Sequence, residues 1–441
     1  MPRTVSSLRQ LSLGKGWSTN TVNTVTFREP GLFTLGRYQF TAFFAGKRTL
    51  RIVRRDLHNN HLTTFDLPGS YNVRDAHDCI SLGHDGDGYL HLAYDHHNSR
   101  LRYRQSKVPL SINAWTDEVP MTGKYEEYLS YPGFVFFPKS GTLLFLFRDG
   151  SSARGLMRIK EWSARRKKWT DRPMAVLSGA DQRPWTSAPY WNHPIVGKDG
   201  SLHLSFVWRA GPIGDKKLVN NIGIDYARSP DRGKNWYSMR DQPFELPITQ
   251  VNSETIWPTS PGSNLINQTS MALDSKGNPH IVFYADDPDG IPQYQHLRFD
   301  GRAWRQRTIS VRRKRFALRG GGTLRLPISR PEILIDGADQ VYVIYRGDLT
   351  GDLMAVQRLL PPAYCADPAD VRILWHEPLG FAEPVVDRSR WQRHGVLSML
   401  IQKNNQPAHD RCGRSEYQPV FIADWNLARL WEPPKGACKP A

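Results

Sequence analysis

Histidine and aspartate side chains gather in two short segments of the chain. The first is DAHD (residues 75–78), and the second is YDHHN (residues 94–98) at the end of an apolar run. His97 lies 20 positions after His77, about one strand, turn and strand, so the two can return to one rim of a sheet. A single histidine is more often a satisfied interior side chain, but several ionisable groups at a strand end favour acid–base chemistry.

A tyrosine and an arginine follow these segments. Tyr131, in SYP (residues 130–132), begins a predicted innermost strand, and Arg148, in FRDG (residues 147–150), ends its neighbour. Both could therefore face His77. Arginine in such a place binds a carboxylate with its planar fork, and tyrosine can shuttle a proton. For Tyr131 an equally good interpretation is packing between sheets.

A glycine-led repeat predicts the scaffold that positions these residues. Seven glycines each open a short run of alternating apolar residues, at spacings of 52 to 77 residues. Strands with a two-residue period, repeated at this interval, are typical of β-propeller blades. We therefore expect an all-β protein in which residues 1–441 form a single seven-bladed propeller. The seven glycines are Gly36, Gly88, Gly141, Gly200, Gly277, Gly337 and Gly395.

The repeat makes the architecture specific. Each blade is expected to have four strands, with the glycine-led run as its second strand, and the two chain ends are expected to meet in one blade. The segment SPDRGKNW (residues 229–236) nearly matches the Asp-box, S-x-D-x-G-x-T-W, and degenerate versions end at Trp169 and Trp304. In such boxes the aspartate holds the turn between the outer strands and the tryptophan packs between blades, so this motif indicates a fold and not a function.

The chain is strongly basic and has no membrane-spanning signal. It carries 59 Lys and Arg against 42 Asp and Glu, a net charge of +17, which favours a polyanionic partner such as nucleic acid, anionic lipid or an acidic polysaccharide. No nucleic-acid-binding motif accompanies the charge, and apolar runs are only strand-length. The densest basic runs, residues 165–168 and 312–315, are interpreted mainly as solvated faces.

The four cysteines are too few and too scattered for a disulfide scaffold. His409 and Cys412 have an H-x-x-C spacing that can chelate zinc, although two further ligands would be needed; the alternative is two free surface side chains. The N-terminal segment lacks the apolar stretch of a secretory signal, which indicates either a cytoplasmic protein or a mature form without its export signal.

Longer stretches carry a family resemblance. They are DAHDCISLGHDGDGYLHLAYDHHNSRLRYRQS (from residue 75), SYP and FRDGSSARG, the VWR strand end (residues 207–209), Asn267-Gln268 and EPLGFAEPVVDRSRW near the C-terminus. Together they resemble the BNR-4 repeat group, from about residue 30 to 426, and within it the seven-bladed ulvan lyases of polysaccharide lyase families 24 and 25.

The resemblance implies β-elimination at a uronic acid of ulvan, a sulfated polymer of rhamnose with glucuronate or iduronate. It implies that His77, His97, Tyr131 and Arg148 are catalytic, with His96 as the alternative to His97. It also implies secretion or a periplasmic location. Arg148 with a histidine would neutralise the carboxylate, Tyr131 would move the proton, and His77 or His97 would be the base for the other epimer. No cofactor is required for this chemistry, and a monomer is expected.

A sulfated polymer also requires cations along its binding groove. The candidates for substrate binding, each near a strand end, are His96, Arg209, Tyr226, Asn267, Arg330 and Arg346. The polymer itself stays open, because rhamnose–glucuronate linkages also occur in plant gums.

Two other classes of function remain. One is a glycoside hydrolase on the same scaffold: a sialidase would use tyrosine, an acid and three arginines, whereas a rhamnosidase would use a histidine and the substrate itself. The other is a non-catalytic glycan- or protein-binding propeller.

Overall fold

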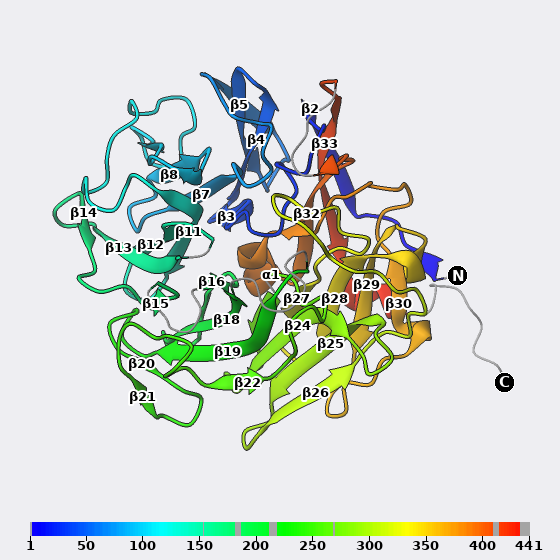
Figure 1. Ribbon diagram of the computed structural model, residues 1–441. Coiled ribbons are helices and arrows are strands. Elements are labelled where there is room, and N and C mark those ends of the chain that lie inside the picture. Colours follow the sequence, from blue (N-terminus) through cyan, green and yellow to red (C-terminus); the bar gives the residue numbers. More distant parts are fainter. Residues whose placement is uncertain are drawn as a thin grey trace.

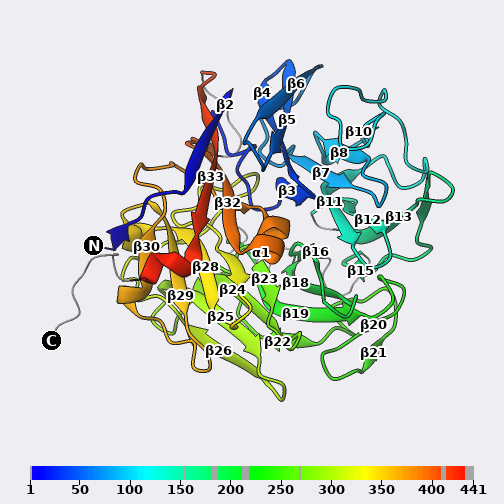
Figure 2. The same ribbon diagram turned by 180° about the vertical axis from the view of Figure 1, so that it is seen from behind.

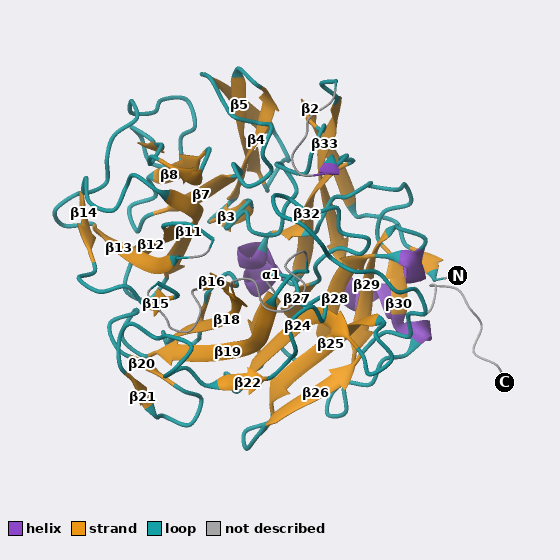
Figure 3. Cartoon of the chain, in the orientation of Figure 1, coloured by secondary structure: helices purple, strands orange, loops and turns teal. Residues whose placement is uncertain are grey.

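The structure is a ring of β-sheets around a central axis. The computed structural model describes residues 2–432 apart from 153, 181–186, 211–217, 268–269 and 409–413. In this part of the chain the strands form seven sheets that radiate from a centre occupied by helix α1 (Arg388–His394), seen from the front in Figure 1 and from behind in Figure 2. Strands and loops make up nearly all of the molecule (Figure 3). The prediction of an all-β propeller is therefore confirmed.

The first four sheets follow one another along the chain. Their strands, in the order of pairing within each sheet, are β3 (Leu32–Leu35), β4 (Tyr38–Gly46), β5 (Thr49–Asp56) and β6 (Leu62–Pro68); β7 (Ile80–His84), β8 (Leu90–Tyr94) and β10 (Tyr103–Gln105); β9 (His97–Ser99), β11 (Leu129–Phe137), β12 (Thr142–Asp149), β13 (Leu156–Ser163) and β14 (Lys168–Asp171), with β15 (Leu177–Ser178) beside β13; and β16 (Ser187–Trp191), β18 (Leu202–Ala210), β19 (Asn221–Ser229), β20 (Trp236–Tyr237) and β21 (Pro243–Phe244), with β17 (Ile195–Val196) beside β18 and β22 (Thr255–Trp257) beside β19.

The remaining three sheets complete the ring. Their strands are β23 (Ser270–Leu273), β24 (Pro279–Asp286), β25 (Pro292–Phe299) and β26 (Trp304–Thr308); β27 (Glu332–Ile335), β28 (Val341–Arg346), β29 (Met354–Leu359), β30 (Val371–Ile373) and β1 (Arg3–Thr4); and β31 (Val385–Val386), β32 (Val396–Gln402), β33 (Tyr417–Asn426) and β2 (Arg9–Trp17). Short 3-10 helices are η1 (Asp348–Thr350), η2 (Pro368–Asp370) and η4 (Leu427–Trp431). Within the described ranges, no helix has the length and apolar character needed to cross a bilayer.

The glycine-led repeat is the second strand in six of the seven sheets, as predicted; in the remaining sheet it is β12, third in the pairing order because β9 is added beside β11. Each run begins just after the turn that joins the first strand to the second; Gly88 (φ 83°) and Gly200 (φ 95°) show why glycine is needed there, since other residues rarely adopt these angles. The predicted closure of the ring is also confirmed. Strand β2 pairs antiparallel with β33, so the N-terminal segment supplies the outer strand of the sheet that holds the last strands.

The prediction of seven four-stranded blades is wrong. Six of the sheets have four or more strands, whereas the sheet β7-β8-β10 has three in the described chain, so the complete blades number six. The segment that would be its fourth strand makes one isolated bridge, Ser106 to Trp115, and the hydroxyl of Thr116 accepts the Gln105 N–H. At this edge the Gln105 N–H thus donates to a side-chain hydroxyl, whereas in a regular ladder it would donate to a backbone carbonyl.

The Asp-box has the structural role that its sequence predicts. Asp231 accepts hydrogen bonds from the N–H groups of Lys234 and Asn235 and from the hydroxyl of Ser229, which holds the turn between β19 and β20. Trp236 is buried, and its indole N–H donates to the carbonyl of Gly233. The box therefore stabilises one blade edge and lies outside the candidate site.

The basic runs follow the predicted pattern with one exception. Residues 165–168 and 313–315 are exposed. Arg312 is buried instead, with its Nε 2.8 Å from Oδ1 of Asp348. Because a buried guanidinium needs a partner, this arginine is part of the fold and not of the basic surface.

The topology places the candidate residues on one face of the ring. Ile80 at the start of β7 pairs with Tyr94 at the end of β8, and Leu129 at the start of β11 pairs with Asp149 at the end of β12. The starts of first strands and the ends of second strands thus share one face, called the site face below. The glycine turns lie on the other, called the turn face.

Candidate active site

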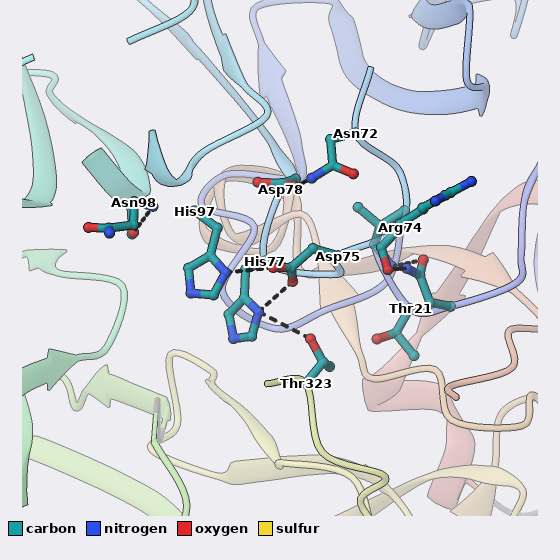
Figure 4. Close-up of polar contacts among 12 residues, drawn as sticks. Thr21, Asn72, Arg74, Asp75, His77, Asp78, His97, Asn98 and Thr323 are labelled. Carbon is teal, nitrogen blue, oxygen red and sulfur yellow. Dashed lines mark hydrogen bonds and ion pairs between the residues drawn. The ribbon is translucent and has the colours of Figure 1, made fainter. Parts of the chain in front are cut away.

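Asp75 holds two histidines through its two carboxylate oxygens. Oδ1 lies 2.7 Å from Nδ1 of His77, and Oδ2 lies 2.5 Å from Nδ1 of His97 (Figure 4). Burial alone would raise the pKa of Asp75, but the hydrogen bonds and charges of the two histidines outweigh it and hold that pKa well below its usual range. Asp75 is therefore an ionised carboxylate that only accepts.

The shared carboxylate defines the state of both imidazoles. Because Asp75 can only accept, each Nδ1 carries a proton, and when a ring is neutral its Nε2 is the basic nitrogen. The rings of His77 and His97 are stacked, with centroids 4.1 Å apart and planes 20° from parallel. Thr323, from the loop before β27, reaches Nδ1 of His77 at 3.1 Å. The result is a pair of basic nitrogens on two rings held side by side.

Tyr131 lies next to this pair. Its ring meets that of His77 edge to face, with centroids 5.8 Å apart, and it packs against Phe27 at 5.2 Å. Its backbone has φ 54°, where the pairing of β11 with β12 shifts register between Ser130 and Gly133. A non-glycine residue in this conformation costs energy, and such strain is concentrated at functional positions. Burial raises the pKa of the phenol, and Tyr190 raises it further. The positive charge of Arg148 lowers it.

Arg148 is buried and lies over the ring of the tyrosine. Its Cζ lies 4.9 Å from the centroid of the Tyr131 ring, and its nitrogens donate to the hydroxyls of Tyr190 at 3.0 Å and Ser130 at 3.1 Å. The Ser130 hydroxyl also accepts the backbone N–H of Asn98 at 2.7 Å. Since β9 pairs with β11 at Ser130 and His97, one serine connects the strand of the histidine to the arginine.

Arg209 and Asn267, both predicted to bind substrate, lie beside this group. Nη2 of Arg209 donates to Oδ1 of Asn267 at 2.8 Å, and Nε donates to Oδ1 of Asn221 at 2.7 Å. Arg209 also lies over the ring of Tyr190, 5.8 Å from its centroid. Burial lowers the pKa of Arg209, but the side chain keeps its charge at neutral pH.

Arg330 completes this side of the site. Its Nε donates to Oε1 of Glu383 at 2.8 Å, and its Cζ lies 5.2 Å from the centroid of Phe27, the ring that also contacts Tyr131. Burial would lower the pKa of Arg330, but Glu383 raises it above its usual value. The positive charge of Arg330 is therefore largely balanced by a carboxylate in the absence of ligand.

The cavity at this site is small. Phe27, Glu29, Tyr131, Tyr190 and Trp191 surround a space of about 10 Å³, roughly that of one water molecule. A sugar ring cannot enter it, so a polymer would lie across the open rim above.

The largest cavity in the described part of the structure, about 1180 Å³, opens on the turn face. The turns of Gly200, Gly277 and Gly337 line it together with helix α1, and none of the catalytic candidates does.

The predicted zinc ligands His409 and Cys412 lie outside the described residues. Among those that are described, Asp75, His77 and His97 are the one group whose ligand atoms lie within 4.8 Å of each other. Their Nδ1 and carboxylate atoms already satisfy one another. A metal bound by these atoms would take the place of the two protons that Asp75 accepts from the histidines.

Sequence comparison assigns the family. Residues 38–312, more than half of the chain, match the BNR repeat-containing family. The chain belongs to this family. No curated protein shows significant sequence similarity to this BNR repeat protein.

Solved structures with the same fold include carbohydrate-active proteins. An ulvan lyase of polysaccharide lyase family PL25 bound to a GlcA(1-4)Rha3S fragment has a TM-score of 0.65 at 12% identity, covering 94% of this BNR repeat protein and 96% of the lyase. The structure of a PL25 ulvan lyase without that fragment gives a TM-score of 0.64 at 12% identity, with the same coverage. An α-L-arabinanase from Penicillium chrysogenum gives 0.44 at 10% identity, covering 96% of this chain and 99% of that one. The TM-scores of the two PL25 structures establish a shared propeller fold.

Three of the predicted binding residues of this BNR repeat protein are corrected. His96 is fully buried, its Nε2 accepts the backbone N–H of Arg102 at 2.8 Å, and burial lowers its pKa to about 3, so it is a neutral interior side chain. Tyr226 is also fully buried, with its hydroxyl 2.6 Å from Nδ1 of His203. Arg346 is buried and donates to the carbonyls of Leu326, Pro327 and Ala382. None of the three is accessible to a polymer.

Two residues of the site were missed in the sequence. Tyr190 and Thr323 belong to no recognisable motif. Tyr190 reaches the site from β16, and Thr323 reaches it from the loop before β27. The shared role of Asp75 was also missed, although it stands in the DAHD segment; the spacing Asp-x-His was its only signal.

Proposed function

We propose that this protein is a polysaccharide lyase that cleaves a sulfated uronic acid polymer of the ulvan type by β-elimination. The observation that carries the proposal is the pair of histidines held on Asp75 beside Tyr131, with Arg148 over the ring of the tyrosine. This arrangement combines a base, an acid and a cation on one rim. The PL25 ulvan lyase with the same fold and the net charge of +17 support the choice of an acidic polymer.

The reaction needs three functions from these residues. The carboxylate of the uronate must be neutralised so that the C5 proton becomes acidic; that proton is removed, the C4–O bond breaks, a C4–C5 double bond forms, and the leaving oxygen takes a proton. Arg148 would bind the carboxylate. One imidazole nitrogen Nε2 or the phenolate of Tyr131 would take the C5 proton.

The electrostatics of the site favour particular roles. Because burial raises the pKa of Tyr131, the phenol is protonated at rest and suited to donate to the leaving oxygen. With Nδ1 of each ring bound to Asp75, Nε2 is the nitrogen of neutral His77 and His97 that suits removal of the C5 proton. For the epimer whose proton points to Tyr131, the neutral imidazole of His77 would first accept the phenol proton. The phenolate, stabilised by the charge of Arg148, would then take the C5 proton, and the re-formed phenol would give it to the leaving oxygen.

A sialidase-like glycoside hydrolase is the second candidate. Three arginines, Arg148, Arg209 and Arg330, surround Tyr131 closely enough to act on its charge. Arg148 would have to release contacts to Tyr190, Ser130 or Gly150 in either reaction. The hydrolase would in addition have to free Arg330 from Glu383 and Arg209 from Asn221 and Asn267. A carboxylate bound by all three would have to displace these contacts, which makes the hydrolase the weaker proposal.

The decisive experiment is a digest of ulvan, gum arabic, heparin and alginate, followed by both ultraviolet absorbance of unsaturated uronate and new reducing ends. We expect both signals to grow together on ulvan. Growth on gum arabic alone would indicate a rhamnose–glucuronate lyase. Reducing ends without absorbance would replace the lyase with a hydrolase, and neither signal on any polymer, with binding retained, would leave a glycan-binding propeller. Since ulvan is an extracellular polymer, we also place the enzyme outside the cell or in the periplasm, acting as a monomer.

A further inference from the structure

Two exposed tyrosines lie on the loop that leads into the site. Tyr128 and Tyr125 are 61% and 43% exposed, and they belong to residues 122–128, called the tyrosine loop below. Tyr128 is three residues before Tyr131, so along the chain it lies within about 10 Å of the candidate site. Large exposed aromatic side chains next to a site of chemistry are typical of ligand contacts.

The Tyr125 ring is held in a defined position. The guanidinium of Arg158 lies 3.7 Å from its centroid, and Nε of Arg158 donates to Oδ2 of Asp149 at 2.7 Å. Asp149 directly follows Arg148 at the end of β12. One face of the Tyr125 ring is therefore covered by a fixed cation, so its exposed area lies on the other face and edge.

The loop that carries the rings is rigid. Glu126 is buried, and its Oε1 accepts the N–H groups of Thr122 at 2.8 Å and Gly123 at 3.1 Å. The ammonium group of Lys160, itself buried, lies 3.1 Å from the same oxygen and donates to the carbonyl of Lys124 at 2.7 Å. A buried ion pair thus anchors a loop whose aromatic side chains point outward, which avoids an ordering cost on binding.

The backbone of Tyr125 is the second unusual feature. Its φ is 59°, a left-handed conformation that a bulky residue adopts at a cost. Asparagine or glycine would suit this turn better, so the fold alone does not explain a tyrosine here. The ring is retained at a position where it strains the backbone and lies half in solvent.

We propose that the tyrosine loop is a distal subsite that binds a further sugar of the same acidic polymer. This inference rests on the proposed function and extends it along the chain of the substrate. The apolar C–H face of a pyranose would pack on the open face of Tyr125 and on Tyr128, and Lys124, exposed beside the ring, would attract its sulfate or carboxylate. The polymer would then run from Arg148 outward along the boundary between β9 and β11.

The test compares a Tyr125→Asn and Tyr128→Ala double variant with the wild type on ulvan and on the shortest oligosaccharide that is cleaved. Asparagine tolerates the left-handed backbone, so the thermal midpoint should be unchanged. We expect KM for the polymer to rise about tenfold with kcat unchanged, and no change for the short substrate. Equal rises of KM on both substrates, or no rise at all, would overturn the subsite.

A matched control and a binding assay separate this inference from the proposed function. Tyr89 also has a cation, Lys167, over its ring, 5.5 Å from the centroid, but it lies in the turn between β7 and β8 on the turn face. In native gels containing intact ulvan, the wild type and Tyr89→Ala should be retarded equally and the double variant much less. This readout needs no cleavage, so it supports the subsite even where no unsaturated product forms. Equal retardation of all three proteins refutes the subsite.

Discussion

The guanidinium of Arg148 lies over the phenol ring of Tyr131, with its Cζ 4.9 Å from the ring centroid. The two residues come from adjacent antiparallel strands, and the register shift in β11 turns Tyr131 into a left-handed conformation opposite the arginine. The charge of Arg148 opposes the rise that burial causes in the pKa of Tyr131. In the proposed reaction, the residue that binds the carboxylate thus also tunes the residue that moves the proton.

Tyr131→Phe should abolish most of the turnover without affecting the fold. The variant keeps the ring that packs on Phe27 and His77 and loses only the hydroxyl. We expect kcat on ulvan to fall by a factor of about 100 to 10,000, with the thermal midpoint and polymer affinity unchanged. Full activity of this variant on every uronate polymer would remove Tyr131 from the mechanism and put the hydrolase first.

Arg148→Lys should impair both binding and chemistry. Lysine keeps the charge but cannot grip a carboxylate with two parallel N–H groups, and it loses the contacts to Ser130 and Tyr190. Steady-state kinetics should show a higher KM and a lower kcat together. A change in KM with kcat intact would mean that the arginine binds the polymer away from the reacting sugar.

Asp75→Asn should disable both histidines at once. The asparagine amide donates on one side and accepts on the other, so it no longer fixes a proton on both Nδ1 atoms. A ring that accepts from the amide at Nδ1 carries its own proton on Nε2, and that Nε2 is no longer basic. We expect kcat to fall by about 100-fold or more. The single variants His77→Asn and His97→Asn are the companions: loss of activity on one uronate epimer only identifies the base for that epimer. An Asp75→Asn variant as active as the wild type would show that the carboxylate has only a structural role.

Salt should separate binding from chemistry. The excess of Lys and Arg in this chain would exchange counterions with a sulfated polymer, so KM for ulvan should rise steeply with ionic strength while kcat at saturation changes little. Initial rates over a series of salt and polymer concentrations check this. An equal effect of salt on kcat and KM would show that the basic charge does not act in binding.

Buried neutral histidines should make the fold sensitive to acid. Burial lowers the pKa of His96 to about 3 and of His84 to about 4, from 6.5 in an unfolded chain. Between these values and 6.5 the unfolded chain binds more protons, so stability is complete above about pH 6.5 and is lost as the pH falls, by up to about 1.4 kcal/mol per group and pH unit. The thermal midpoint should therefore drop steeply from pH 6 to pH 4.

The His96→Gln variant tests the origin of this acid sensitivity. The glutamine oxygen can accept the Arg102 N–H in place of Nε2 but takes up no proton. Its midpoint should decline less with acid than that of the wild type. Parallel curves for the two proteins would exclude His96 as a source of the pH dependence.

Local features of the structure could be predicted from the sequence. The second strand of each sheet and the Asp-box turn depend on residues a few positions apart, whose turn preferences and alternating apolar pattern act within the segment. The segments DAHD, YDHHN, SYP and FRDG could be recognised for the same reason, because each places its polar residues at a strand end.

The tertiary structure decided which members of these segments meet. His96 and His97 are adjacent, but β9 leaves its own blade to pair with β11, which turns His97 toward Asp75 and buries His96. Likewise, Tyr190 from a first strand reaches Arg148, whereas Tyr226 from a third strand packs against Trp304. The pattern of side chains along one strand cannot distinguish a residue that reaches the site from one that is buried between sheets. The choice depends on the distance of each strand from the axis and on its partner strand, and both are set by contacts between residues far apart in the chain.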